Sequence, residues 1–389
     1  MKSYVVGGAV RDELLGLAVR DRDHVVVGAT PEEMERQGYR PVGKDFPVFL
    51  HPETHEEYAL ARTERKVARG YKGFTVYAAP DVTLEDDLRR RDLTINAMAR
   101  DDHGALIDPY GGARDLAARV LRHVSPAFAE DPVRILRVAR FAARFDFSIA
   151  ADTLALMRRM VAEGEAGALV PERVWQELSK GLMEAHPQRL FGVLAECGLL
   201  ASLFRECVFA FDGAAPANDA ARVAMNALVR AAGQGLALPQ RFALLSFSVA
   251  GEGDERAANL DALLARLRAP NDCADAAALA LHKGTAVMNA HRADAAALLA
   301  MVEAADGFRR PARLEGLLGT CEAQQFGAQG WTDLPWPPRQ ALLRALAAAR
   351  GVDAAAIART ITAGGGKDIG AALRAARTRA VQAAMEAMT

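Results

Sequence analysis

The alternation of apolar and polar residues is strand-like in the first third of the chain. Short apolar runs there are separated by turns and by short helical segments. Runs of this length, bounded by turn residues, are typical of β-strands. The expected strands are Ser3–Gly7, His24–Val27, Pro47–His51, Glu57–Ala61 and Ala105–Ile107. We therefore expect residues 1–120 to form a head in which a mixed β-sheet packs with helices.

The pattern becomes helical after about residue 120. Segments of helical length begin there at capping or helix-breaking residues. These expected helices are Asp131–Phe145, Asp152–Ala162, Pro171–Glu184 and Pro187–Cys197. The rest of the chain is rich in alanine and leucine and also predicts helices, with Gly364–Gly366 as a flexible joint. The expected fold class is α+β, with a head at 1–120, an all-α neck at 121–200, and an all-α body and tail at 201–389.

Composition and charge are those of an ordinary globular protein. Of the 389 residues, 51% are hydrophobic and 25% are charged, and the net charge is −1. A neutral balance does not by itself favour nucleic acid as a partner, but a local basic groove is compatible with it. The four cysteines are widely spaced and form no Cys-x-x-Cys pair, so zinc and disulfides are not expected. With no expected signal peptide and no apolar stretch of membrane-spanning length, the sequence predicts a cytoplasmic protein without a membrane partner.

Two carboxylates near a glycine pair are the first candidate for chemistry. Asp21 and Asp23 follow Gly7-Gly8 after a short helical segment. In a strand, residues i and i+2 point to the same face, so the two carboxylates are expected to project together. Such a pair is costly without a cation, and Mg²⁺ prefers oxygen ligands and substrate phosphates. Because a Gly-Gly turn lets backbone approach a phosphate, these residues predict nucleotidyl transfer with paired magnesium ions, and Glu57 is a possible third carboxylate.

Two less specific interpretations of this region compete with that prediction. An Asp-x-Asp pair is common on solvated strand ends, and one Gly-Gly pair is a weak signal. A dinucleotide-binding loop requires the pattern G-x-G-x-x-G. Here the glycines are adjacent and are followed by Ala9, Val10 and Arg11, so this second interpretation is excluded.

A second candidate is the charged run at residues 83–97. Three consecutive arginines on one short element cannot all share a face, so at least one is expected to point at a ligand or partner. The forked guanidinium suits a triphosphate. Asp92, directly after them, is expected either to orient Arg91 or to accept a hydrogen bond from a ribose. The alternative is a solvated helix face.

A third candidate is the start of the helix near Asp131. Arg134 falls inside the apolar stripe formed by Val138, Phe141 and Phe145. An arginine there is expected to be paired or bound to a ligand, because an unpaired buried charge is strongly disfavoured. Either an Asp–Arg pair ties one helix to another, or the two side chains offer hydrogen-bonding groups to a nucleobase.

These motifs, in this order, resemble the bacterial class II tRNA nucleotidyltransferases, the CCA-adding enzymes of the polymerase β superfamily. The similar segments are Val5–Asp12, Asp21–Asp23, Arg90–Ala97, Glu130–Arg134, Arg137–Phe141 and Glu172–Leu178. The stretch Gly43–His51 is similar to the gammaproteobacterial CCA-adding type. The resemblance covers residues 1–200 well and the rest only vaguely.

The resemblance implies template-independent addition of C, C and A to the 3′ end of tRNA from CTP and ATP, with release of pyrophosphate. Asp21 and Asp23 would be catalytic and would hold Mg²⁺. The residues that it assigns to the nucleotide are Gly8 and Arg11 at the triphosphate, Arg91, Asp92 near the ribose, Asp131 and Arg134 at the base edge, and Arg137 and Arg140 completing the pocket. The helical body would grip the tRNA. A poly(A) polymerase, an enzyme that adds only A or only CC, and a non-catalytic RNA-binding protein are the alternatives.

The chain departs from this family after residue 200. Related long enzymes carry a phosphohydrolase domain with a His-Asp dipeptide and further histidine ligands. Phe247 and Ser248 stand where His and Asp are expected, and only His282 and His291 remain in this region. Two histidines without a His-Asp pair do not make such a metal centre. We expect a degenerate domain without phosphohydrolase activity.

Overall fold

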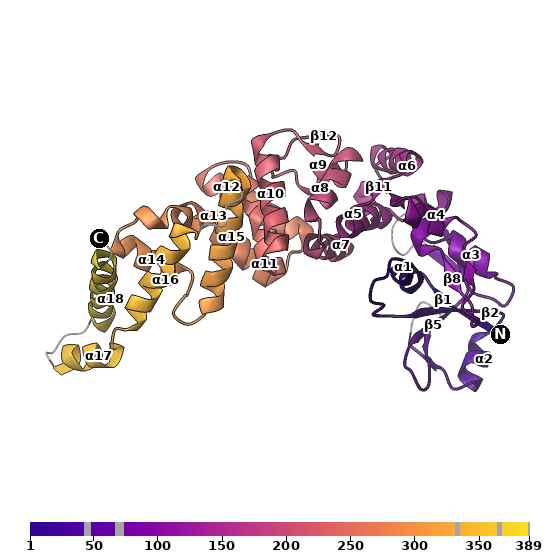
Figure 1. The fold of residues 1–389 in the computed structure, drawn as a ribbon, viewed down its shortest axis with the longest axis horizontal. Coiled ribbons are helices and arrows are strands. Elements are labelled where there is room, and N and C mark those ends of the chain that lie inside the picture. Colours follow the sequence, from indigo (N-terminus) through magenta and orange to yellow (C-terminus); the bar gives the residue numbers. More distant parts are fainter. Residues whose placement is uncertain (43–47, 67–73, 331–334, 364–367, 388–389) are drawn as a thin grey trace. The chain divides into compact units, whose positions relative to one another are not determined.

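The chain divides into two compact units in a computed structural model. The structure describes residues 1–42, 48–66, 74–330, 335–363 and 368–387, so Gly43–Pro47 and Gly364–Gly366 of the sequence predictions lie outside it. One unit comprises Met1–Gly181 and Arg189–Ser202, and the other comprises Leu182–Gln188 and Leu203–Thr389. The predicted α+β class is confirmed (Figure 1). The predicted head and most of the predicted neck fall in the first unit, while Leu182–Gln188 of the predicted neck falls in the second.

A mixed seven-stranded sheet organises the first unit. Only β2 and β5 pair in parallel; the other neighbours in this sheet are antiparallel. In sheet order the strands are β3 (Arg40–Pro41), β4 (Val48–Leu50), β5 (Glu57–Leu60), β2 (Asp23–Val27), β1 (Lys2–Val6), β8 (Ala99–Arg100) and β9 (Leu106–Ile107). The expected strands of the head are therefore present, with ends that match the prediction or differ from it by one residue.

Three strand ends meet at one edge of this sheet. Val6, the last residue of β1, pairs with Asp23, the first residue of β2, and Asp23 also pairs with Glu57, the first residue of β5. At Gly7 the chain turns away with φ +72° into helix α1 (Gly8–Leu14). Because β1 ends at Val6, opposite Asp23, no residue of β1 lies opposite position 21. The prediction that both aspartates lie on one strand is wrong, since Asp21 precedes β2.

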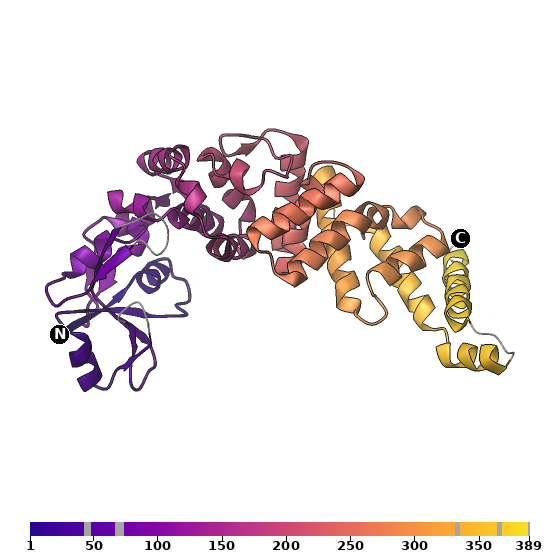
Figure 2. The ribbon, with the colours of Figure 1, turned by 180° about the vertical axis from the view of Figure 1, so that it is seen from behind.

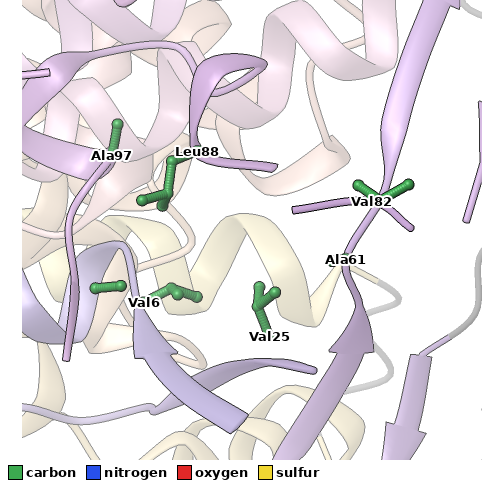
Figure 3. Close-up of a cluster of buried hydrophobic side chains, with 7 residues drawn as sticks. Val6, Val25, Ala61, Val82, Leu88 and Ala97 are labelled. Atoms are coloured by element: carbon green, nitrogen blue, oxygen red, sulfur yellow. The ribbon is translucent and has the colours of Figure 1, made fainter. Parts of the chain in front are cut away.

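Alternation along β2 supplies a core on each face of the sheet. Val25 packs with Val6 and Leu88, the last of these from helix α3 (Leu84–Arg89), and Figure 3 shows these side chains converging. Its neighbour Val26 packs on the other face with Met34 of helix α2 (Pro31–Arg36). Successive strand residues point to opposite faces, which explains this division. Each fully buried valine contributes about 2 kcal/mol, so the ends of β1 and β2 are held firmly.

The remaining elements of the first unit are mostly helical. They are β6 (Thr63–Lys66), β7 (Phe74–Tyr77), η1 (Thr94–Asn96), α4 (Gly112–Ala117), β10 (Val120–Leu121), η2 (Pro126–Glu130), α5 (Val133–Phe145), β11 (Ser148–Ile149), α6 (Ala151–Ala162), η3 (Glu165–Ala168), α7 (Pro171–Met183), α8 (Pro187–Glu196) and α9 (Leu200–Leu203). The four predicted helices correspond to α5, α6, α7 and α8. Helix α5 begins at Val133, two residues later than expected, and the Asp131 carboxylate accepts a hydrogen bond from its amide at 3.1 Å.

The second unit is built from helices and one two-stranded ribbon. Its elements are β12 (Phe211–Asp212), β13 (Ala215–Pro216), α10 (Asp219–Gly233), α11 (Leu238–Ala243), η4 (Leu244–Ser248), α12 (Gly253–Leu267), α13 (Asn271–Met288), η5 (Ala290–Arg292), α14 (Ala295–Ala304), α15 (Pro311–Gln329), α16 (Pro337–Arg350), α17 (Ala354–Ala363) and α18 (Ile369–Glu386). Helix α10 lies along α15, and α11 lies beside α13 (Figures 1 and 2). Within the described ranges, no helix combines the length and the apolar character needed to cross a bilayer.

Candidate active site

Asp21, Asp23 and Glu57 line one cavity at the edge where the strand ends meet. The cavity has a volume of about 520 Å³. Its other lining residues are Val19, Arg20, Arg22, Thr54, His55 and Glu56. All three carboxylate side chains belong to exposed residues, and none forms a hydrogen bond or an ion pair with another residue that the structure describes. Neighbouring like charges without counter-ions favour binding of a cation.

The donor set fits a divalent metal, but the three carboxylates do not form a ready-made cluster. Hard oxygen ligands suit Mg²⁺. Among the described residues, no group of three or more His, Cys, Asp or Glu side chains is close enough to hold a metal ion. Glu57 is therefore in the cavity wall without completing a three-ligand set, and its role as a third ligand stays a prediction.

Arg91 lies against the glycine turn at the end of β1. A Cβ atom on Gly7 would stand 2.6 Å from Nη1 of Arg91, so only glycine allows this approach. Nη2 of Arg91 lies 3.3 Å from the buried carboxylate of Asp87, one helical turn earlier. Its buried Nε has no hydrogen-bond partner within the described part of the chain. The arrangement holds a guanidinium beside the turn, and a guanidinium suits an anion. The residue that orients Arg91 is Asp87, not Asp92.

We expect Gly7→Ala to weaken both folding and nucleotide incorporation. The alanine would adopt a glycine-only conformation and displace Arg91, at a cost of about 2 kcal/mol in the free energy of unfolding. Misplacing Arg91 is expected to lower incorporation about tenfold. Gly28→Ala is the matched control, because Gly28 has φ +73° and a Cβ atom added there would meet nothing within 4 Å. Thermal unfolding and incorporation would be measured for both variants; an equal loss of incorporation would contradict the role of Arg91.

Asp92 is the centre of a buried polar network. Its Oδ1 accepts hydrogen bonds from the Leu93 amide at 2.8 Å and Asn96 Nδ2 at 3.0 Å, and its Oδ2 accepts one from Arg137 Nε at 2.6 Å. Burial alone would raise the pKa of Asp92, but the Arg137 guanidinium and the Asn96 hydrogen bond hold it well below its usual value. In turn Asp92 raises the pKa of Arg137. The network therefore joins Asp92 to helix α5.

The Arg11 side chain, on α1, is buried against α5. It is 4% exposed, and it donates from Nε to Asp12 at 2.8 Å and from Nη1 to Asn96 at 2.5 Å. Its guanidinium carbon lies 5.1 Å from the ring centres of both Phe141 and Phe145. Burial lowers the pKa of Arg11. The structure thus gives Arg11 a packing role, while contacts of Arg11 and Gly8 with a triphosphate stay predictions.

The α5 arginines are paired, as the position of Arg134 in the apolar stripe predicted. Arg134 donates to the backbone carbonyls of Ala127 at 3.1 Å and Arg90 at 2.6 Å. Arg140 donates from Nε to Glu177 at 2.6 Å, and Arg137 Nη1 lies 3.9 Å from the same carboxylate. Arg134, Arg137 and Arg140 therefore stand in fixed positions along one side of α5.

Asp131 forms an ion pair between helices, but not with Arg134. Both of its oxygens accept hydrogen bonds from Arg173 of α7, at 3.1 and 2.7 Å. This forked geometry is the stronger form of an arginine–carboxylate pair. One alternative from the sequence was an Asp–Arg pair made by Asp131 and Arg134; the structure instead pairs Asp131 with Arg173, which lies 42 positions further along the chain.

Four residues that the sequence analysis did not single out hold the predicted site residues in place. Asp87 orients Arg91, Asn96 bridges Asp92 and Arg11, Glu177 binds Arg140, and Arg173 binds Asp131. Asp87 could have been found from its spacing of four residues before Arg91 on a helix. Arg173 and Glu177 lie in the segment Glu172–Leu178, for which the sequence indicated a resemblance but no individual roles.

Two family models match parts of this chain. Residues 3–122 match the poly(A) polymerase head domain, and residues 146–209 match the probable RNA- and SrmB-binding site of polymerase A. The first match covers the sheet, the cavity and the Arg91 turn.

Curated relatives extend the similarity to almost the whole chain. The chain is 55% identical to the multifunctional CCA protein of Methylobacillus flagellatus, over 92% of each chain. This chain belongs to the multifunctional CCA protein family. The member of the family from Paraburkholderia phytofirmans is 52% identical over 99% of this chain and 100% of its own length. The predicted relationship to CCA-adding enzymes is thereby confirmed.

Solved CCA-adding enzymes share the fold of this family member. A CCA-adding enzyme in complex with CTP superimposes with a TM-score of 0.69 at 25% identity, covering 98% of this chain and 87% of the other. The Thermotoga maritima CCA-adding enzyme complexed with tRNA has a TM-score of 0.66 at 23% identity, covering 100% and 92%. The head and the helical elements that follow it therefore occur together in solved structures.

Proposed function

We propose that this chain is a template-independent nucleotidyltransferase that adds C, C and A to the 3′ end of tRNA from CTP and ATP and releases pyrophosphate. The observation that carries the proposal is a pair of carboxylates, Asp21 and Asp23, that line one cavity in a member of the CCA family and form no hydrogen bond or ion pair with a described residue. Arg91 and Gly7 stand at the adjoining strand end. A cation site and an anion site at one sheet edge suit a metal-bound triphosphate.

Asp21 and Asp23 would hold the divalent metal that nucleotidyltransferases of this kind typically use. Mg²⁺ is the ion that we propose, with two ions expected, because both side chains offer only hard oxygen ligands. When bound, such ions activate the attacking 3′-hydroxyl and neutralise charge on the leaving pyrophosphate. Catalysis of phosphoryl-type transfer is mainly positioning and charge neutralisation, so no general-base histidine is required.

The remaining side chains would bind and select the nucleotide. Arg91, whose side chain is 19% exposed, would donate to a phosphate oxygen from its guanidinium. Asp131 and Arg134 would read the edge of the base, since cytosine and adenine both present an amino donor and a ring-nitrogen acceptor. Arg137 and Arg140 would complete the pocket from the same helix. Asp92, near the ribose, would also keep Arg137 in place.

The helical elements of the second unit would bind the tRNA through its shape and backbone. One solved relative is a CCA-adding enzyme with tRNA bound. A location in the cytoplasm, expected from the sequence, stays part of this proposal.

Nucleotide choice separates this function from its nearest alternative. Because residues 3–122 match the poly(A) polymerase head domain, a poly(A) polymerase is the second candidate. Purified protein would be incubated with tRNA lacking its last three nucleotides and with CTP alone or ATP alone. We expect two cytidines from CTP alone and little addition from ATP alone. A long A tail would identify a poly(A) polymerase, and ready addition of A to a tRNA already ending in CC but none of C would identify an A-adding enzyme.

We also infer that this chain lacks phosphohydrolase activity, although its curated relatives are called multifunctional. Phe247 packs so closely on Gly284 of α13 that a Cβ there would lie 2.6 Å from its ring. Ser248 is buried, and Arg256 donates to the carbonyls of Ser246 and Phe247 at 3.2 and 2.8 Å. Close packing at this position supports a structural role.

The expected result is no metal-dependent hydrolysis of a 2′,3′-cyclic phosphate. The reason is that neither Phe247 nor Ser248 offers the imidazole and carboxylate ligands of a metal centre. The assay would use purified protein with Mg²⁺, Mn²⁺, Ni²⁺ or Co²⁺ in turn, and nucleotide incorporation by the same preparation would show that it is active. Metal-dependent turnover that copurifies with the protein would contradict the inference.

A further inference from the structure

Helix α7 presents two charged side chains to α5. Arg173 and Glu177 stand four residues apart and therefore share one face of α7. Arg173 donates from Nη1 and Nη2 to the two oxygens of Asp131, and Glu177, which is 5% exposed, accepts from Arg140 at 2.6 Å. One helix face thus contacts two of the residues that the proposed function places around the base.

The contacts at Asp131 fix its carboxylate without saturating it. Oδ1 accepts from the Val133 amide and from Arg173, both at 3.1 Å, and Oδ2 accepts from Arg173 at 2.7 Å. A carboxylate has roughly four acceptor positions, so capacity remains for a further donor. Rotation of the carboxylate is prevented because both oxygens are bound to the planar fork of one guanidinium.

We propose that Arg173 is a positioning residue for nucleotide selection, acting by orienting Asp131 toward the amino group of the incoming base. The proposal rests on the proposed function, in which Asp131 reads that base. Lysine cannot reproduce the two parallel hydrogen bonds, although it keeps the charge. Arg173 therefore affects selection through geometry, and the size of the effect depends on whether Asp131 is present.

The test compares the ratio of kcat/KM for CTP to that for ATP on tRNA lacking its last three nucleotides. Variants would be Arg173→Gln, Arg173→Lys, Asp131→Ala and the double variant Asp131→Ala with Arg173→Gln. We expect Asp131→Ala and Arg173→Gln each to change the ratio about tenfold, because small misplacement of a positioned group is costly. Arg173→Lys should fall between wild type and Arg173→Gln. The double variant should match Asp131→Ala alone, since Arg173 acts through Asp131.

Arg189→Gln is the matched control. Arg189 belongs to α8, has a similarly half-buried side chain, and lies 3.1 Å from Asp146 just beyond the other end of α5. It should leave the ratio unchanged, and thermal unfolding would show how much each variant destabilises the protein. If Asp131→Ala changes the ratio but Arg173→Gln does not, or if the effects of the two changes add, the positioning role is refuted while base reading stands. An unchanged ratio in Asp131→Ala would refute base reading by Asp131 and the positioning role with it.

Discussion

Asp23→Asn is expected to reduce nucleotide incorporation by at least about 1,000-fold while leaving tRNA binding intact. Asparagine keeps the size of the side chain but removes the charge that would hold the metal ion. In the structure, the Asp23 carboxylate lines the cavity and forms no hydrogen bond or ion pair with a described residue. Removing the charge therefore breaks no hydrogen bond or ion pair between that side chain and the part of the chain that the structure describes. Single-turnover incorporation, a tRNA-binding titration and thermal unfolding would be measured on the same preparation.

A matched control for this variant lies in the same unit. Asp102→Asn removes an exposed carboxylate, 79% accessible, that lies 3.6 Å from His103 and outside the cavity lining. It should incorporate nucleotides like wild type. Asp21→Ala should behave like Asp23→Asn, because both residues line the cavity. Near-normal turnover of the Asp21 and Asp23 variants would remove the proposed metal site.

Asp92→Asn is expected to be the most destabilising of these substitutions, lowering the free energy of unfolding by about 3 kcal/mol. The change removes the charge that pairs with Arg137 at 2.6 Å, and the partly buried Arg137 would be left with the more distant Glu177 carboxylate, at 3.9 Å, as counter-charge. Incorporation should also fall, since Arg137 would no longer be held in place. Urea unfolding would give the difference in the free energy of unfolding between wild type and Asp92→Asn. Asp219→Asn, which breaks an exposed pair with Arg222, is the control and should change stability little.

The same pair predicts how stability depends on pH. The pKa of Asp92 is lower in the folded state than in the unfolded chain, because burial is outweighed by Arg137 and the Asn96 hydrogen bond. Its contribution is therefore fully present above the unfolded pKa of about 4 and is lost as the pH falls below that value toward the folded pKa. Asparagine does not titrate in this range. The stability difference between wild type and Asp92→Asn should thus shrink as the solution is acidified; a constant difference would contradict this assignment.

Local sequence patterns predicted much of the fold, because whether a segment forms a strand or a helix depends largely on residues close together in the chain. The short apolar run at Val25–Val27 predicted β2, and the helical periodicity predicted α5 to within two residues. Arg134 was predicted to be paired or bound to a ligand because of its position in an apolar stripe, and the structure shows it paired. Its partners, the carbonyls of Ala127 and Arg90, were not predictable, since every residue carries such an acceptor.

The parts of the site that sequence reasoning missed depend on packing between distant segments. The pairing of Asp131 with Arg173 follows from how α7 lies on α5, and no periodicity reports it. The position of Asp21 was mispredicted for a similar reason. Whether β2 extends to residue 21 depends on where its neighbour β1 ends, and β1 ends at Val6 because Gly7 turns the chain.

The central claim is that this protein adds C, C and A to tRNA at the cavity lined by Asp21 and Asp23. It is tested most directly by sequencing the 3′ ends of tRNA that lacks these nucleotides after incubation with both CTP and ATP. The account predicts that wild-type protein restores CCA and then stops, and that Asp23→Asn leaves the ends unchanged. No addition by wild-type protein, continued growth into an A tail, or restored CCA ends with Asp23→Asn would contradict it.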